Sequence, residues 1–195
     1  MQSEAGTQPS GVKMRIRDIA RDDMTQAQRR VTDEAVSGKR GRMPAPLRAW
    51  IHSPELGQRA QKLGELLRYD TVLGSRLSEL AILVTARFWT SRYEWFAHRS
   101  EALKAGLEPD IIEAIAAHSE PHFSDARSRV VYDYARQLHQ THEIPSDLHA
   151  AAVRELGDQG VVELVGLLGY YTLVAMTLNA FEIGLPAGAE SELGP

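Results

Sequence analysis

The chain of 195 residues contains no cysteine. This absence excludes disulfide bonds, thiolate metal sites, iron–sulfur clusters and catalysis by a thiol. The glycine motifs that bind phosphates or dinucleotides, the HExxH zinc motif and the GxSxG hydrolase motif are also missing. The remaining composition, 43% hydrophobic and 25% charged, is typical of a folded globular domain.

The sequence has no excess of positive charge and no clear membrane or export signal. Its 22 basic and 26 acidic residues give a net charge of −4, which argues against nucleic acid as a partner. The N-terminus has neither a basic start nor an apolar stretch, so we expect a cytoplasmic protein. The apolar run 164–178 is shorter than the roughly 20 residues of a spanning helix. We therefore expect it in the core or a subunit interface and not in a membrane.

Helix signals dominate the chain and predict an all-α fold. Pro54 and Pro109 stand at first-turn positions, Ser124-Asp125 is a helix start, and Gly157 separates two helices. After Pro54, an apolar pattern predicts one buried side, made of Leu56, Ala60, Leu63, Leu66 and Leu67. No segment alternates between polar and apolar residues as a strand does.

The domain organisation follows from the composition of the two ends. We expect a flexible N-terminal arm over residues 1–20, a single helical domain over 21–184 and a flexible C-terminal tail over 185–195. The glycine-rich and basic segment 38–42 is interpreted as a linker, because no phosphate-loop pattern surrounds it.

One group of residues has the pattern of an acid–base site. Glu94 and His98 are four residues apart, so they project from one face of one helix. Glu79 lies in the apolar run of the preceding helix, where a carboxylate must be paired or its pKa rises. Two carboxylates and a histidine on adjacent helices predict acid–base chemistry that needs no cofactor.

A purely structural interpretation competes with this one. Ser91-x-x-Glu94 has the pattern of a capping box, in which both side chains bond to backbone N–H groups. His98 is then a core residue bonded to Glu79 or Glu94. The sequence alone leaves both interpretations open.

The segments 77–83, 91–98 and 102–107 resemble the carboxymuconolactone decarboxylase family, whose superfamily also contains the alkylhydroperoxidase D-like proteins. Weaker similarity extends over residues 45–183. The resemblance implies an alkylhydroperoxidase D-like helical bundle that forms homo-oligomers: trimers, hexamers or dimers. In the peroxidase branch, a Cys-x-x-Cys pair occupies the positions of Ser91 and Glu94. Thiol peroxidase chemistry is therefore not expected here.

The resemblance also implies a function. It points to cofactor-free, metal-free decarboxylation or proton transfer on a small lactone or carboxylic acid. His98 would be the acid–base residue, oriented by Glu79 or Glu94, and Ser91 would donate a hydrogen bond. Arg87, Arg92 or Arg99 would bind a substrate carboxylate. The alternatives are a peroxidase-like antioxidant protein without redox cysteines and a non-catalytic oligomeric binding protein.

Overall fold

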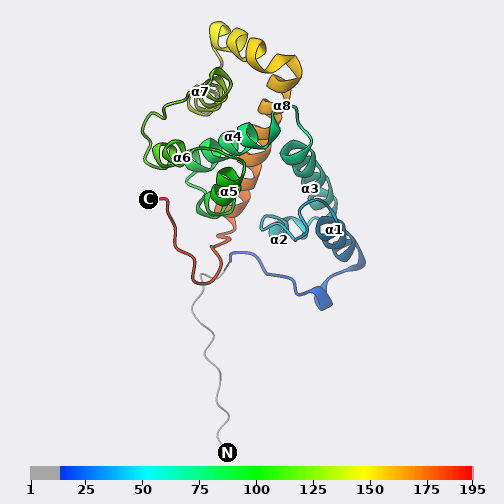
Figure 1. Ribbon diagram of the computed structural model, residues 1–195. Helices are drawn as coiled ribbons and strands as arrows, with labels where there is room; N and C mark the ends of the chain where they lie inside the picture. The colour runs from blue at the N-terminus through cyan, green and yellow to red at the C-terminus, as the bar shows by residue number, and fades with distance from the viewer. Residues whose placement is uncertain (1–13, 195) are drawn as a thin grey trace, which may run out of the picture.

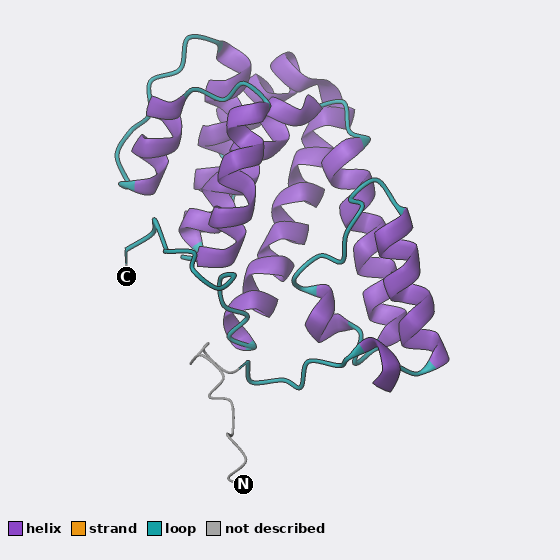
Figure 2. Ribbon diagram, turned by 60° about the horizontal axis from the view of Figure 1, so that its bottom comes forward, coloured by secondary structure: helices purple, strands orange, loops and turns teal. Residues whose placement is uncertain are grey.

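The computed structural model describes residues 14–194, and no strand occurs in this part of the chain (Figure 2). The all-α prediction is confirmed. A short 3₁₀ helix, η1 (Arg21–Asp23), precedes eight α-helices. These are α1 (Gln26–Ser37), α2 (Leu47–Trp50), α3 (Pro54–Tyr69), α4 (Gly74–Phe88), α5 (Arg92–Lys104), α6 (Pro109–Ala116), α7 (Ala126–Thr141) and α8 (Ser146–Ala180).

Helix α4 is the centre of the bundle. Every residue from Leu77 to Arg87 is buried, because helices α3, α5, α6, α7 and α8 all pack against it (Figure 1). A helix buried on all sides must be apolar nearly all round, and α4 is. Its buried polar residues are Ser78, Glu79, Thr85 and Arg87, and the carboxylate of Glu79 is the only acidic group among them, with the residue 4% exposed.

Helix α8 is kinked where the sequence places a boundary between two helices. Gly157 has φ 72° and ψ 167°, a non-helical conformation that glycine adopts without a steric penalty. The part of α8 before the kink turns away from the part after it (Figure 1). The second part packs into the bundle with Leu164, Leu167 and Tyr171 buried.

Among the described residues, α8 is the one helix that is long and apolar enough to cross a membrane. Its most apolar window has a mean hydropathy of 1.7, and 56% of this window is buried in the protein. That burial is typical of a core helix.

The predicted buried side of α3 is wrong. Ala60 and Leu67 are buried, but Leu56, Leu63 and Leu66 are 48%, 46% and 53% exposed. The packed side instead carries small residues, because α8 approaches closely: a side chain added at Gly64 would collide with the hydroxyl of Tyr170. The pattern of leucines thus marks an outer apolar surface.

Segments assigned to flexible ends contact the bundle. Ile19 is buried, and the Arg15 N–H donates to the Phe181 carbonyl at 3.0 Å. Near the C-terminus, Leu193 is 3% exposed and Glu192 pairs with Arg99 of α5 at 2.7 Å. The packed region therefore begins before residue 21 and extends beyond 184; residues 1–13 and 195 of the expected arm and tail lie outside the described residues.

The start of α7 gives a direct test of the helix signals. The Asp125 carboxylate accepts a hydrogen bond from the Ser128 N–H at 2.7 Å, as the predicted N-cap requires. Asp125→Ala should lower the free energy of unfolding by about 1 kcal/mol, measured by urea denaturation. Ser124→Ala is the control at the neighbouring position, and equal stability of the two variants would contradict this assignment.

Candidate functional site

A histidine–carboxylate pair joins α4 and α5. The Nδ1–H of His98 donates to Oε2 of Glu79 at 2.7 Å, and both side chains are buried. Helix α5 returns antiparallel to α4 through a tight turn at Thr90, which has φ 44°. This turn places His98 beside Glu79, as the sequence predicts. The other ring nitrogen, Nε2, makes no hydrogen bond with any described residue.

Arg68 from α3 completes this group. Its Nε donates to Glu79 Oε1 at 3.2 Å and its Nη2 donates to Glu101 Oε2 at 3.3 Å. Burial raises the pKa of Glu79. The charges of His98 and Arg68, and the hydrogen bonds that both donate to the carboxylate, outweigh this effect, so the net shift lowers the pKa. Glu79 is therefore an ionised carboxylate that fixes the orientation of the imidazole.

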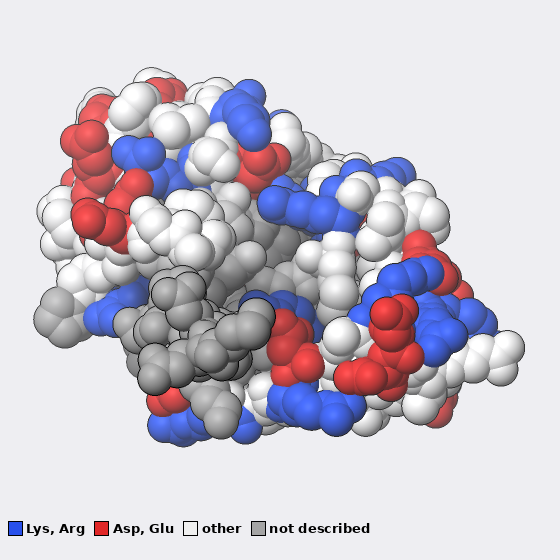
Figure 3. Space-filling view, turned by 90° about the horizontal axis from the view of Figure 1, so that it is seen from below, with Lys and Arg blue, Asp and Glu red and all other residues white. Residues whose placement is uncertain are grey.

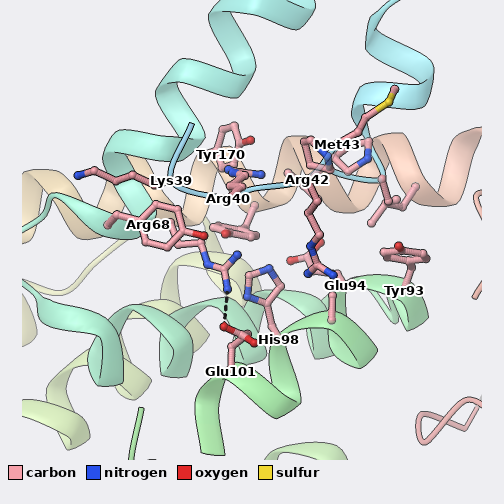
Figure 4. Close-up of a pocket in the computed structure, with 18 residues that line it drawn as sticks. Lys39, Arg40, Arg42, Met43, Arg68, Tyr93, Glu94, His98, Glu101 and Tyr170 are labelled. Atoms are coloured by element: carbon pink, nitrogen blue, oxygen red, sulfur yellow. Dashed lines mark hydrogen bonds and ion pairs between the residues drawn. The ribbon is translucent and has the colours of Figure 1, made fainter. Parts of the chain in front are cut away.

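His98 lies on the wall of a cavity of about 440 Å³ (Figure 4). Helices α3, α5 and α8 form most of its walls, and the segment 38–46, here called the basic strap, crosses it. This volume suits a small organic molecule. The lining side chains are Lys39, Arg40, Arg42, Met43, Pro44, Ala45, Pro46, Arg68, Tyr69, Tyr93, Glu94, Ala97, His98, Glu101, Tyr170, Tyr171, Val174 and Leu178.

Glu94 is buried like Glu79 but has no cationic partner within the described part of the structure. It is 1% exposed, and neither carboxyl oxygen has a hydrogen-bond partner among the described residues. Burial raises the pKa of Glu94 well above its ordinary value, and the nearby Ser91 hydroxyl only partly opposes this. Burial therefore favours the neutral, protonated form of Glu94, which lies on the wall that also carries His98. It does not orient the imidazole.

The capping-box interpretation of Ser91 and Glu94 is wrong. Ser91 is the N-cap residue of α5, but its side chain makes no capping hydrogen bond. Its hydroxyl is buried and has no well-formed hydrogen bond to any described residue. Neither side chain is thus used to satisfy the helix N-terminus.

The three arginines predicted to bind substrate do not line the cavity around His98. Arg87 donates from Nε to the Ala116 carbonyl at the end of α6 at 2.9 Å, and from Nη1 to the Thr90 hydroxyl in the turn after α4 at 3.2 Å. Arg99 pairs with Glu192 in the C-terminal segment. Arg92 is exposed on α5 and faces a different groove.

The cations that do line the cavity were missed. Arg68 lies at the end of α3, whereas Lys39, Arg40 and Arg42 belong to the basic strap. The sequence signal for these cavity cations is the run of basic residues and glycines over 38–42, which by its composition resembles a linker. Elsewhere, the surface seen from below shows basic and acidic side chains intermixed, with no extended basic area (Figure 3).

Comparison with protein families identifies one match. Residues 54–137 match the carboxymuconolactone decarboxylase family. No curated protein sequence matches the chain.

Solved structures share the fold. A peroxidase-related protein from Silicibacter sp. TM1040 superposes with a TM-score of 0.74 at 17% identity, covering 93% of this chain and 96% of its own. An alkylhydroperoxidase AhpD core protein from Ralstonia eutropha JMP134 superposes with a TM-score of 0.75 at 17% identity, covering 91% of this chain and 95% of its own. The debrominase Bmp8 in complex with 2,3,4-tribromopyrrole superposes with a TM-score of 0.69 at 10% identity, covering 93% of this chain and 95% of its own. The predicted alkylhydroperoxidase D-like fold is confirmed.

The neutral state of Glu94 makes a prediction about stability. Folding raises the pKa of the Glu94 carboxyl. Its contribution to the free energy of unfolding is therefore fully present below the unfolded-state pKa and is lost as the pH rises through the folded-state pKa. Glu94→Gln, which is always neutral, should gain stability relative to the wild type by about 1.4 kcal/mol per pH unit in that window. Urea denaturation at pH 5 and pH 8 measures this. The exposed Glu113→Gln is the control, and a pH-independent difference for Glu94→Gln would contradict the assignment.

Proposed function

We infer that this chain, which carries the carboxymuconolactone decarboxylase family region over residues 54–137 without the cysteine pair, is a cofactor-free enzyme for small lactones or carboxylic acids. The reaction class that we propose is decarboxylation or the related proton transfer. The observation that carries this proposal is the buried Glu79–His98 pair, whose imidazole lines a cavity with cationic walls.

His98 is the proposed acid–base residue, and Glu79 positions it. With Nδ1–H bonded to an ionised carboxylate, Nε2 is the nitrogen that exchanges a proton with a ligand. Glu94 adds a hydrogen-bond donor on the cavity wall, whereas the buried Ser91 hydroxyl, at the start of the same helix, does not line the cavity. The resemblance places the two cysteines of the peroxidase branch at these positions.

A carboxymuconolactone illustrates the chemistry. The bond between the ring carbon and its carboxylate breaks, CO₂ leaves, and the electron pair moves into the unsaturated lactone. A proton from the imidazolium of His98 or from the Glu94 carboxyl is then added to carbon, and solvent restores the donor. The protein needs only to hold the anion, supply that proton and exclude water.

Two alternatives fit the observations less well. A non-catalytic binding protein has no need for a buried acid and a buried histidine–carboxylate pair on one cavity wall, since both cost desolvation energy. A peroxidase-like activity without cysteine requires another redox group, and no described feature calls for one.

We also propose that the working unit is a homo-oligomer. The outer side of α8 has an apolar stripe at Val162, Val165, Leu173 and Met176, which are 38–72% exposed. The exposed leucines of α3 lie on the neighbouring helix, and a second copy of this chain would cover both.

Decarboxylation can be measured directly. The protein incubated with γ-carboxymuconolactone should release CO₂, and His98→Ala should lower kcat by a factor of about 10²–10⁴, the usual contribution of an acid–base group. His149→Ala, which changes a histidine outside the cavity, is the matched control. Absence of CO₂ release above background, or an unchanged rate in His98→Ala, would refute the proposal.

The assembly has its own test. Light scattering coupled to size exclusion should give a mass that is a multiple of 21.6 kDa. Val162→Glu combined with Leu173→Glu should shift the protein toward the monomer, because charges on the stripe oppose its burial. A wild-type monomer at micromolar concentration would contradict the proposal.

A further inference from the structure

The guanidinium of Arg40 is incompletely satisfied. Its Nε and Nη2 atoms are buried, and neither has a hydrogen-bond acceptor among the described residues. Arg40 lies on the basic strap, before the family region at residues 54–137, and its side chain lines the cavity (Figure 4).

The two unsatisfied nitrogens form one edge of the guanidinium. The Nε–Nη2 edge presents two parallel N–H donors, the geometry that binds both oxygens of a carboxylate. Buried charged donors without an acceptor carry a large desolvation penalty, which an anionic ligand offsets. The Nε–Nη2 edge is therefore suited to an anionic ligand that offers two oxygen acceptors side by side.

Tyr170 provides a third donor at the same place. Its side chain is 3% exposed and lines the cavity, and its hydroxyl makes no hydrogen bond of good geometry among residues 14–194. Burial raises the pKa of Tyr170, and the adjacent Arg40 guanidinium partly opposes this, so the hydroxyl and the guanidinium are close neighbours. A Cβ placed on Gly64 would lie within 2.5 Å of Arg40 Nη2 and would also collide with the Tyr170 hydroxyl, so the two groups meet over this glycine. Glycine at position 64 leaves room for them.

The other cations of the cavity are in different situations. Arg68 is paired with Glu79 and Glu101, and Lys39 is paired with Asp70. Arg42 is exposed, so water hydrates its charge. Arg40 alone among these four combines burial of its donors with the lack of an acceptor in the described part of the chain.

We propose that Arg40 and Tyr170 form a carboxylate-binding subsite, which anchors a small organic acid in the cavity that contains His98. The proposal rests on the same cavity as the proposed function, but binding of the acid does not require that the acid react. The four tyrosines of the cavity lining, Tyr69, Tyr93, Tyr170 and Tyr171, favour an acid with a flat apolar body.

Calorimetric titration with benzoate tests the subsite, with benzamide as the uncharged analogue. The wild type should bind benzoate at least about tenfold more tightly than benzamide. Arg40→Gln should weaken benzoate binding by a factor of about 10–100 and leave benzamide unchanged. Tyr170→Phe should weaken benzoate about threefold to tenfold. Arg92→Gln removes one positive charge outside the cavity and should change benzoate affinity less than twofold.

Circular dichroism verifies that each variant is folded. If Arg40→Gln does not fold, Arg40→Lys replaces it, because lysine keeps the charge but lacks the two-donor edge; about a tenfold loss of benzoate affinity is then expected. Unchanged affinity in the Arg40 variant, an equal loss in Arg92→Gln, or no benzoate binding by the wild type would overturn the subsite. Selective loss in the Arg40 variant without CO₂ release from the lactone would uphold the subsite and refute the decarboxylase.

Discussion

The arrangement of this molecule depends on a single buried negative charge. Glu79 lies on the central helix α4, where apolar side chains surround it, and an ionised carboxylate there is stable only with partners. His98 of α5 and Arg68 of α3 are those partners. The three helices must therefore pack in one register, and that register places the imidazole of His98 on the cavity wall. A requirement of folding and a requirement of the site are met by the same contacts.

The two glutamates of the site show how environment assigns different states to one residue type. Glu79 is held ionised by cationic neighbours, while Glu94 is kept neutral because it is buried without any. One is suited to orienting and stabilising a cation, the other to donating a proton.

The sequence predicts those features that arise within one helix or at its ends. Prolines, caps and Gly157 located the helix boundaries, and the spacing of Glu94 and His98 placed both on one face of α5. The burial of Glu79 followed from its apolar neighbours. Each of these features is decided by residues that are close together in the sequence.

Features that depend on packing between distant segments were not accessible. The arginines chosen from the sequence lie close to His98 along the chain, but one residue along a helix is a rotation of about 100°. Arg99 therefore points away from the face that carries His98. The pairing of Arg68 with Glu79, and the position of Arg40 over the cavity, depend on how α3 and the basic strap fold onto α5 and α8. The buried side of α3 was misjudged for the same reason, since small residues can pack a helix as firmly as leucines do.

The ion pair between Glu192 and Arg99 has a practical consequence for handling the protein. Arg99 follows His98 directly, and Glu192 also accepts a hydrogen bond from the indole of Trp95 at 3.2 Å. The last residues of the chain are thus fastened to the helix that carries the imidazole. An affinity tag or a fluorescent fusion attached after Glu192 would disturb its contacts with Arg99 and Trp95, and truncation before Glu192 would remove them.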